Sequence, residues 1–266
     1  MRLTLAPLGG LANRMRAILS ASALAKHAAL PLRIVWMRDK GLNARFDELF
    51  EPTSFFQVEE IPGWKNIAFL PPCKRNLFIP RLLQMGYEQT FCDTQLAELQ
   101  HTPERLLELA KGRNILISSG LGFYPADSSL YSSCFLPKQD ILDAASRRLA
   151  ELSPDVVGVH IRRTDNAVSI SKSPVEAFVE RMRQLNPSQF YLATDSEEVK
   201  RQLNQLFPGR IVCSSQPASR QTLQGMRDAV AEMFILSRTS YFLGSYYSSF
   251  SDIILEMNGK GEIVLA

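Results

Sequence analysis

The chain of 266 residues contains few cysteines and few histidines, four and three respectively. The cysteines are scattered and form no C-x-x-C pair, which argues against a zinc site or a redox dithiol and fits a reduced, cytosolic location. No run of 18 or more apolar residues occurs, so no transmembrane segment is expected. The first residues enter a strand-like alternation without the charged and apolar regions of a signal peptide. We therefore expect a cytoplasmic protein, with peripheral membrane contact left open.

Several catalytic motifs are also missing. The sequence has no G-x-G-x-x-G and no Walker A motif, so neither a standard dinucleotide site nor an NTPase P-loop is expected. It has no G-x-S-x-G of a serine hydrolase, no H-E-x-x-H, and no D-x-D of the kind found in many metal-dependent sugar transferases. The formal net charge of +3 is too small to indicate nucleic-acid binding, although it permits local anion sites. We expect neither a metal nor a nucleic-acid partner.

Strands and helices alternate along much of the chain. Strands are predicted at 2–8, 32–36, 115–118, 155–160, 190–193, 211–213, 241–243 and 262–265, and helices at 12–28, 103–111, 138–152, 174–185, 196–207, 222–236 and 249–258. Residues 38–87 are less regular and receive no assignment. Such alternation predicts an α/β fold with parallel sheets covered by helices on both faces. Because Ser153-Pro154 breaks a helix, we predict two domains, 1–152 and 153–266, with a cleft between them.

The stretch "VVGVHIRRTD" (156–165) places charged residues at the end of a buried strand. In a parallel sheet, ligands bind beyond the carboxyl ends of the strands. Side chains alternate along a strand, so His160 and Arg162 share one face and Arg163 points to the other. An arginine fork here suits a phosphate, with which it forms bidentate, charge-assisted hydrogen bonds. For one of the two arginines, a structural ion pair between Arg163 and Asp165 is the alternative.

Two further stretches follow predicted strands of the C-terminal half. In "GSYYSSFS" (244–251), Ser248 or Ser249 would cap a helix whose N-terminus offers N–H groups to an anion, although a serine in this place often has only the capping role. In "YLATDS" (191–196), Asp195 or Ser196 would cap the next helix. Near the N-terminus, "LGGLANRMR" (8–16) turns from strand to helix and places Asn13 and Arg14 at a helix start, facing the cleft.

These pieces, in this order, resemble the fucosyltransferase superfamily that includes the α1,2- and α1,6-fucosyltransferases, the nodulation fucosyltransferase and the protein O-fucosyltransferases. The matching stretches are "GGLANRMRAILSA", "VGVHIRRTD", "FYLATDS" and "FILSRTSYFLGSYYSSFSD", of which H-x-R-R-x-D is the most specific. Residues 38–150 match no motif. The resemblance implies an α/β, GT-B-like fold, in which two Rossmann-like domains face each other across a cleft. It also implies inverting, metal-independent transfer of fucose from GDP-fucose to a glycan or glycolipid hydroxyl, without a cofactor.

The resemblance also implies roles for individual residues. Arg162 would bind the diphosphate and be essential for transfer, and His160 would contact the guanine–ribose region. Glu232 stands where relatives carry an acid that reads guanine, often aspartate. The remaining nucleotide-sugar residues would be Arg163, Thr194 and Asp195, then Ser248, Ser249 and Phe250 around the diphosphate, and Gly10, Asn13 and Arg14 in the N-terminal domain. Without a metal, Arg162 and the helix N-terminus would stabilise the charge on departing GDP.

The general base is not carried over by the resemblance. The α1,6 relatives have a glutamate after the arginine motif, and the aligned residue here is Ile170. Asp165, Glu176 or an acceptor-assisted route remain, with Asp165 preferred, because Ser173-Pro174-Val175-Glu176 fits a capping box. Two alternatives stay open: the same fold with another nucleotide sugar, or a nucleotide-sugar-binding protein without catalysis. Acceptor contacts are expected in the loops of 38–100 and 120–133.

Overall fold

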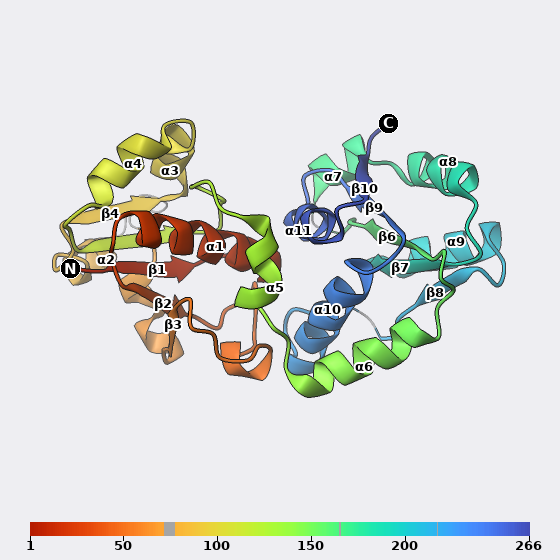
Figure 1. Cartoon of the computed structure of the whole chain (residues 1–266), viewed down its shortest axis with the longest axis horizontal. Coiled ribbons are helices and arrows are strands. Elements are labelled where there is room, and N and C mark those ends of the chain that lie inside the picture. The colour runs from red at the N-terminus through yellow and green to blue at the C-terminus, as the bar shows by residue number, and fades with distance from the viewer. Residues whose placement is uncertain (72–77, 165, 217) are drawn as a thin grey trace. The chain divides into compact units, whose positions relative to one another are not determined.

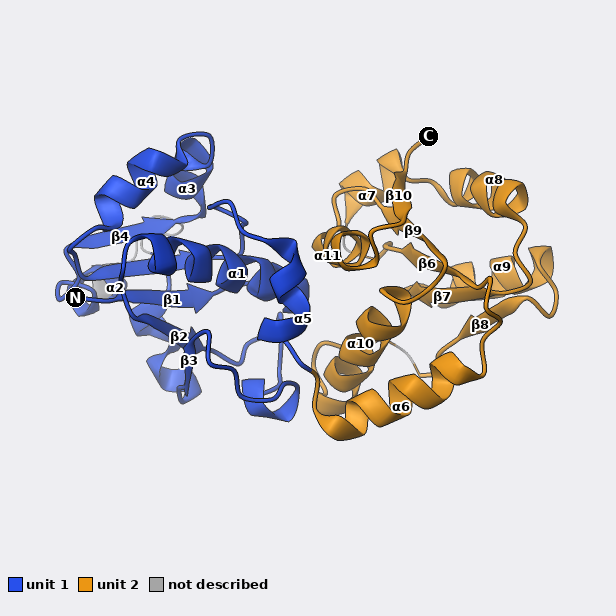
Figure 2. Ribbon diagram, viewed as in Figure 1, with its two compact units in different colours: residues 1–136 blue, residues 137–266 orange. Residues whose placement is uncertain are grey.

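The computed structural model describes residues 1–71, 78–164, 166–216 and 218–266 (Figure 1). The chain divides into two compact units, Met1–Leu136 and Pro137–Ala266 (Figure 2). Each unit contains one five-stranded sheet in which every pairing is parallel. The predicted α/β class with two parallel sheets is therefore confirmed.

The sheet of unit 1 has the strand order β3-β2-β1-β5-β4. The strands are β1 (Leu3–Pro7), β2 (Leu32–Trp36), β3 (Gln57–Glu60), β4 (Gln89–Cys92) and β5 (Ile115–Ser119), and the helices are α1 (Leu11–His27), α2 (Phe78–Leu83), α3 (Asp93–Leu99), α4 (Pro103–Ala110) and α5 (Tyr131–Cys134), with 3-10 turns at Phe46–Glu48, Gly63–Phe69 and Ser128–Leu130. β1 is central and entirely buried, as expected of a parallel strand covered on both faces.

The turn between β1 and α1 depends on glycine. Gly9 has a φ of +82°, and a Cβ atom there would lie 2.9 Å from Asn13 Nδ2. Gly10 then forms the N-cap of α1 in an extended conformation. The alanine-rich α1 buries several of its small side chains, among them Ala17 and Ala21. This turn brings the start of α1 to the carboxyl end of the central strand.

The sheet of unit 2 has the order β10-β9-β6-β7-β8, again with the first strand of the unit in the centre. Its strands are β6 (Val157–Ile161), β7 (Phe190–Thr194), β8 (Ile211–Cys213), β9 (Tyr241–Ser245) and β10 (Gly261–Val264), and its helices are α6 (Gln139–Ala150), α7 (Ala167–Lys172), α8 (Val175–Leu185), α9 (Glu197–Leu206), α10 (Leu223–Leu236) and α11 (Ser249–Asn258). Val159 of β6 lies opposite Leu192 of β7 and Leu243 of β9, in a core that excludes water.

The predicted domain boundary at 152/153 does not coincide with the division at Leu136/Pro137. Helix α6, which the prediction placed in the first domain, packs along α10 in unit 2 (Figure 1). The break at Ser153-Pro154 is real, but it separates α6 from β6 within one unit. A helix-breaking pair cannot distinguish a domain boundary from an ordinary loop.

The structure bears on two further expectations. Among the described residues, no helix has the length and apolar character needed to cross a membrane. Cys134 and Cys213 are free thiols, whereas Cys92 is disulfide-bonded. The expectation of reduced cysteines is therefore wrong for Cys92. Because disulfides are typical of oxidising compartments, this bond weighs against the cytoplasmic location, which stays a prediction.

Candidate functional site

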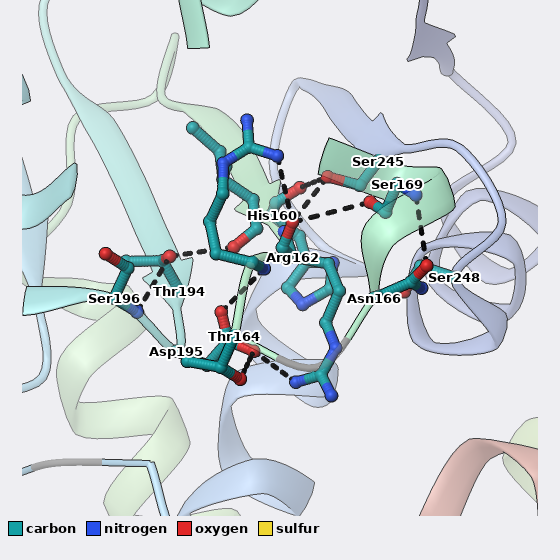
Figure 3. Close-up of polar contacts among 12 residues, drawn as sticks. His160, Arg162, Thr164, Asn166, Ser169, Thr194, Asp195, Ser196, Ser245 and Ser248 are labelled. Atoms are coloured by element: carbon teal, nitrogen blue, oxygen red, sulfur yellow. Dashed lines mark hydrogen bonds and ion pairs between the residues drawn. The ribbon is translucent and has the colours of Figure 1, made fainter. Parts of the chain in front are cut away.

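The carboxyl end of β6 carries the polar residues that the sequence singled out (Figure 3). The strand pairs with β7 on one side and β9 on the other, so the segments that follow these three strands meet at one edge of the sheet. Arg162 leaves the strand with its backbone N–H donating to Ser245 Oγ at 3.0 Å. Ser245 Oγ in turn donates to the carbonyl oxygen of His160 at 3.2 Å. These bonds join the end of β6 to the end of β9.

Asp195 holds the three residues that follow Ile161. Its carboxylate accepts a hydrogen bond from the Arg162 guanidinium, from the Arg163 backbone N–H at 2.8 Å and from Thr164 Oγ1 at 2.8 Å (Figure 3). The side chains of Arg162 and Asp195 retain 16% and 13% of their exposure. The guanidinium is thus oriented by a partly buried carboxylate and still reaches solvent, as an anion site requires.

Thr194 and Ser196 stabilise the same segment from β7. Thr194 Oγ1 donates to the carbonyl oxygen of Ile161 at 2.7 Å and accepts from the Ser196 backbone N–H at 3.3 Å. Ser196 is the N-cap of α9, and its side chain accepts from the Val199 backbone N–H at 3.3 Å. Of the two residues predicted to cap this helix, Ser196 has that role, and Asp195 is left to hold the arginine loop.

His160 is nearly buried and neutral. Its Nδ1 lies 2.7 Å from Ser251 Oγ, and its ring centroid lies 4.8 Å from that of Phe250. Burial lowers the pKa of His160 to about 4; the nearby Asp195 opposes this shift, and Arg162 adds to it. At neutral pH the imidazole therefore has one N–H donor and one acceptor, and it brings no second positive charge to the site.

The N-terminus of α11 borders the same edge. Ser248 is its N-cap, and its side chain accepts from the Ser251 backbone N–H at 3.5 Å. Tyr247 before it has a φ of +55°, and its carbonyl oxygen accepts from Asn166 Nδ2 at 2.8 Å. The backbone N–H groups of Ser249 and Phe250 belong to the first turn of the helix, where an anion finds donors and a partial positive charge.

The side chain of Arg163 contacts the backbone. Its guanidinium donates to the carbonyl oxygens of Arg162 at 3.0 Å and of Ser173 at 2.7 Å. Of the two arginines, Arg163 therefore has the structural contacts, while its predicted role in nucleotide binding stays a prediction. The alternative partner Asp165, which is also the preferred base, lies outside the described residues.

The predicted capping box at Ser173 is wrong. Pro174 is the N-cap of α8, and no side chain caps that helix. Ser173 is fully buried, donating to the carbonyl oxygen of Val264 and accepting from the Tyr246 backbone N–H at 2.9 Å. Glu176 is exposed on the first turn of α8. Ile170, where the α1,6 relatives have a glutamate, is 43% exposed on α7.

Glu232 lies on α10 within a group of ionisable side chains. Burial raises its pKa to about 7, the nearby Asp228 adds to the shift, and Lys200 opposes it. Burial raises the pKa of Tyr191 in β7, and the charge of the nearby Glu232 adds to this increase. Lys200 donates to Glu197 Oε1 at 2.7 Å and to the carbonyl oxygen of Ser214 at 3.2 Å. The carboxyl group of Glu232 is therefore poised to change charge near neutral pH.

Three predicted site residues belong to unit 1. Arg14 is wholly buried: its guanidinium donates to the carbonyl oxygens of Gly9 and Met37, pairs with Asp39 at 2.9 Å and lies over the ring of Trp36. The expectation that Arg14 faces a cleft is therefore wrong. Asn13 is partly exposed, with its Oδ1 accepting from Arg16 at 3.0 Å. Gly10 serves as the N-cap of α1, and the ligand roles of Gly10 and Asn13 stay predictions.

Several residues of the site were not predicted. Ser245 and Ser251 lie in a stretch that the sequence singled out, but their roles depend on contacts with His160 of β6. Thr164 and Asn166 have no distinguishing sequence signal, since both are ordinary loop residues. Burial lowers the pKa of Arg162, Asp195 opposes this shift, and Arg220, from the segment before α10, adds to it. Within the described ranges, no three His, Cys, Asp or Glu side chains gather as a metal site would require.

The chain matches no protein-family model, and no curated protein matches its sequence. Its fold is similar to solved structures. The NodZ α-1,6-fucosyltransferase soaked with GDP-fucose has 17% identity and a TM-score of 0.65, over 96% of this chain and 92% of that chain. Fucosyltransferase NodZ from Bradyrhizobium has 18% identity and a TM-score of 0.65, over 95% of this chain and 91% of that chain. POFUT1 in complex with GDP-fucose has 12% identity and a TM-score of 0.57, over 99% of this chain and 97% of that chain. The likeness confirms the α/β, GT-B-like fold.

Proposed function

We propose that the chain is a fucosyltransferase-like glycosyltransferase that transfers fucose from GDP-fucose to a glycan hydroxyl, with inversion and without a metal ion. The observation that carries the proposal is the edge of the unit 2 sheet. There Arg162, oriented by Asp195, lies at the end of β6, and the N-terminus of α11 follows the neighbouring β9. Similar folds, compared over nearly their whole length, include structures with GDP-fucose and GDP.

The proposed chemistry follows from the charges. Breaking the sugar–phosphate bond leaves negative charge on the departing GDP. Arg162 supplies a guanidinium, and the first turn of α11 supplies backbone N–H groups, both held in place before the reaction. His160 and Glu232 would contact the nucleoside, and Thr194, Ser248, Ser249 and Phe250 would line the rest of the site. Unit 2 would thus hold the donor, and the contacts of Gly10 and Asn13 with the sugar or acceptor remain predictions.

Deprotonation of the acceptor hydroxyl requires a base, and we propose Asp165 for it. Glu176, which is exposed on α8, and an acceptor-assisted route remain the alternatives, since the position of the glutamate in the α1,6 relatives is Ile170 here. The acceptor would be a glycan or glycolipid, with a peripheral membrane contact in the latter case. Another nucleotide sugar as donor, or binding without catalysis, are the alternatives that the experiment must separate.

A thermal-shift panel of GDP, UDP, ADP and CMP tests the donor, each with EDTA and with Mg²⁺. Stabilisation by GDP, equal in both conditions, is the expected result, and at a ligand concentration 100 times Kd it amounts to about 2.7 kcal/mol. Stabilisation by UDP and not GDP would refute the proposed donor. Release of GDP from GDP-fucose then distinguishes an enzyme from a binding protein, and the anomeric configuration of the product tests inversion.

A further inference from the structure

Ser251 lies on the buried side of α11, beside His160. Its Oγ accepts the backbone N–H of Ser245 at 2.9 Å and lies 2.7 Å from His160 Nδ1. Ser251 has no exposed surface, and His160 has 8%. Among the residues that the structure describes, these two groups are the only hydrogen-bonding partners of Ser251 Oγ. Water is therefore not available to complete the bonding of this hydroxyl group.

The direction of the bond to His160 follows from the number of protons. A hydroxyl group has one proton to donate and two lone pairs to accept with. The Ser245 N–H can only donate, so it occupies one lone pair. If His160 Nδ1 were protonated, it would occupy the other, and the hydroxyl proton would be buried without an acceptor, which is unfavourable. All the groups are satisfied when Ser251 donates to an unprotonated Nδ1.

The second ring nitrogen then carries the proton. His160 Nε2 has no hydrogen-bond partner among the described residues, and the residue keeps 8% of its exposure. The low pKa of His160 keeps the ring neutral at physiological pH. The ring thus presents a single N–H donor, held in direction by Ser251 on one side and by packing against Phe250.

We propose that Ser251 is a positioning residue that fixes the tautomer of His160 with the proton on Nε2, so that this N–H donates to an acceptor atom of the bound nucleotide. The ligand group at this point is then a carbonyl, ring nitrogen, hydroxyl or phosphate oxygen, and a ligand N–H is rejected because it would face another donor. The identity of the ligand rests on the proposed function, whereas the tautomer does not.

The first experiment uses the ligand-free protein. Long-range ¹H–¹⁵N NMR spectra of the imidazole rings separate the two neutral tautomers, and the chain has only three histidines to assign. His160→Gln identifies the signals of His160 by their loss. At neutral pH the expected pattern is an unprotonated Nδ1 and a protonated Nε2. A protonated Nδ1 overturns the inference, whatever GDP does.

The second experiment measures GDP affinity by calorimetry and donor hydrolysis by GDP release. Ser251→Ala is expected to weaken GDP binding and raise the KM for GDP-fucose about tenfold, with kcat changed less than about threefold. Ser251→Thr keeps the hydroxyl and is expected to recover most of the loss. GDP binding by Ser251→Ala equal to that of the original protein overturns the positioning role.

A matched pair of histidine variants covers the case in which Ser251→Ala does not fold. Glutamine can place an amide N–H near the Nε2 position, whereas asparagine can replace only the Nδ1 side. His160→Gln is therefore expected to bind GDP about tenfold more tightly than His160→Asn, and the reverse order contradicts the assigned donor. Failure of the original protein to bind GDP at all would refute the proposed function and leave the NMR result standing.

Discussion

Each unit carries an arginine in the segment that follows the central strand of its sheet, yet the two arginines differ in position and in surroundings. β1 and β6 are the central strands of their sheets; Arg162 directly follows β6, whereas Arg14 lies on α1, the helix that follows β1. Arg14 has no exposed surface, and its guanidinium is surrounded by two backbone carbonyls, a carboxylate and an indole ring. Arg162 keeps 16% exposure beside the carboxylate of Asp195.

This difference separates a structural arginine from one available to a ligand. A buried guanidinium must have its donors satisfied within the protein, because desolvation of an unpaired charge is costly. A guanidinium that stabilises developing charge must instead be oriented and still reach the ligand. An arginine in the segment that follows a central strand therefore does not by itself indicate a ligand contact.

The largest expected effect is that of Arg162→Ala on catalysis. Removing a preorganised donor from the departing diphosphate should lower the rate of GDP-fucose turnover about a hundredfold or more, equivalent to about 3 kcal/mol. The melting temperature should change by less than about 4 °C, because the side chain is partly exposed. GDP release and thermal unfolding, measured on the same preparation, check both statements.

Arg162→Lys is the matched control, since it keeps the positive charge and loses the planar guanidinium group. Lysine cannot form the bidentate contact of arginine with a phosphate, so only a part of the activity should return. Near-normal turnover by Arg162→Ala would remove the proposed mechanism.

Arg14→Ala, in contrast, should lower the stability of the protein and leave its affinity for GDP unchanged. It removes the buried donor of the Gly9 and Met37 carbonyl oxygens and the cationic partner of the Asp39 carboxylate. We expect a loss of about 3 kcal/mol in the free energy of unfolding, measured by urea denaturation. Calorimetry on the folded fraction should give the GDP affinity of the original protein. A weaker GDP affinity at unchanged stability would show that the contrast between the arginines is wrong.

The sequence predicted the strand and helix pattern of unit 2 well because its signals are local. The apolar stretch before His160 gives β6, and Gly259 ends α11 in a left-handed conformation, as glycine commonly does. Helix α7 was missed, because six residues without clear periodicity carry little signal. Strand β3 and helix α2 in the irregular region, and β4 and α3 just after it, were missed for a similar reason.

The errors at the candidate site arise from contacts between distant segments. Ser173 has the sequence context of a cap, but Val264 and Tyr246 take up its hydroxyl group. Arg14 is buried because Trp36 and Asp39 come from another part of unit 1. Local sequence patterns indicate where a residue lies along its own helix or strand. They do not show which partners the fold brings to it from distant parts of the chain.

The carboxylates beside the two arginines allow a finer comparison. Asp195→Asn keeps the shape but removes the charge that orients Arg162 and one of the acceptors that hold Arg163 and Thr164. We expect about a tenfold lower kcat/KM for GDP-fucose, since the guanidinium loses its alignment rather than its charge. Steady-state measurements of GDP release check this value.

Asp39→Asn is the corresponding change in unit 1. Asp39 pairs with Arg14 and also accepts the backbone N–H groups of Gly41 and Leu42. It should lower the free energy of unfolding by about 1–3 kcal/mol and leave kcat/KM unchanged. Equal effects of the two variants on kcat/KM would contradict the separation of roles.

The smallest expected effect concerns two acids with raised pKa values, Glu232 in unit 2 and Glu60 in unit 1. Burial raises the pKa of both, that of Glu232 to about 7. If the carboxylate of Glu232 accepts donors of guanine, GDP affinity should rise about tenfold between pH 6 and pH 8, as the group loses its proton. Calorimetric titration across this range checks the rise, and Glu232→Gln should bind GDP more weakly and with little dependence on pH.

The stability of the ligand-free protein should change in the opposite sense. Between the ordinary glutamate pKa of about 4.3 and the value near 7, the native state holds a proton that the unfolded state has lost. The contribution of Glu232 to the free energy of unfolding therefore decreases as the pH rises through this window. Glu60, whose Oε1 accepts the Phe46 backbone N–H, follows the same rule. Glu60→Gln should therefore alter the pH dependence of stability and leave GDP binding unchanged. A change in the GDP titration with Glu60→Gln, or a flat titration of the original protein, would contradict the assignment of nucleotide contact to Glu232.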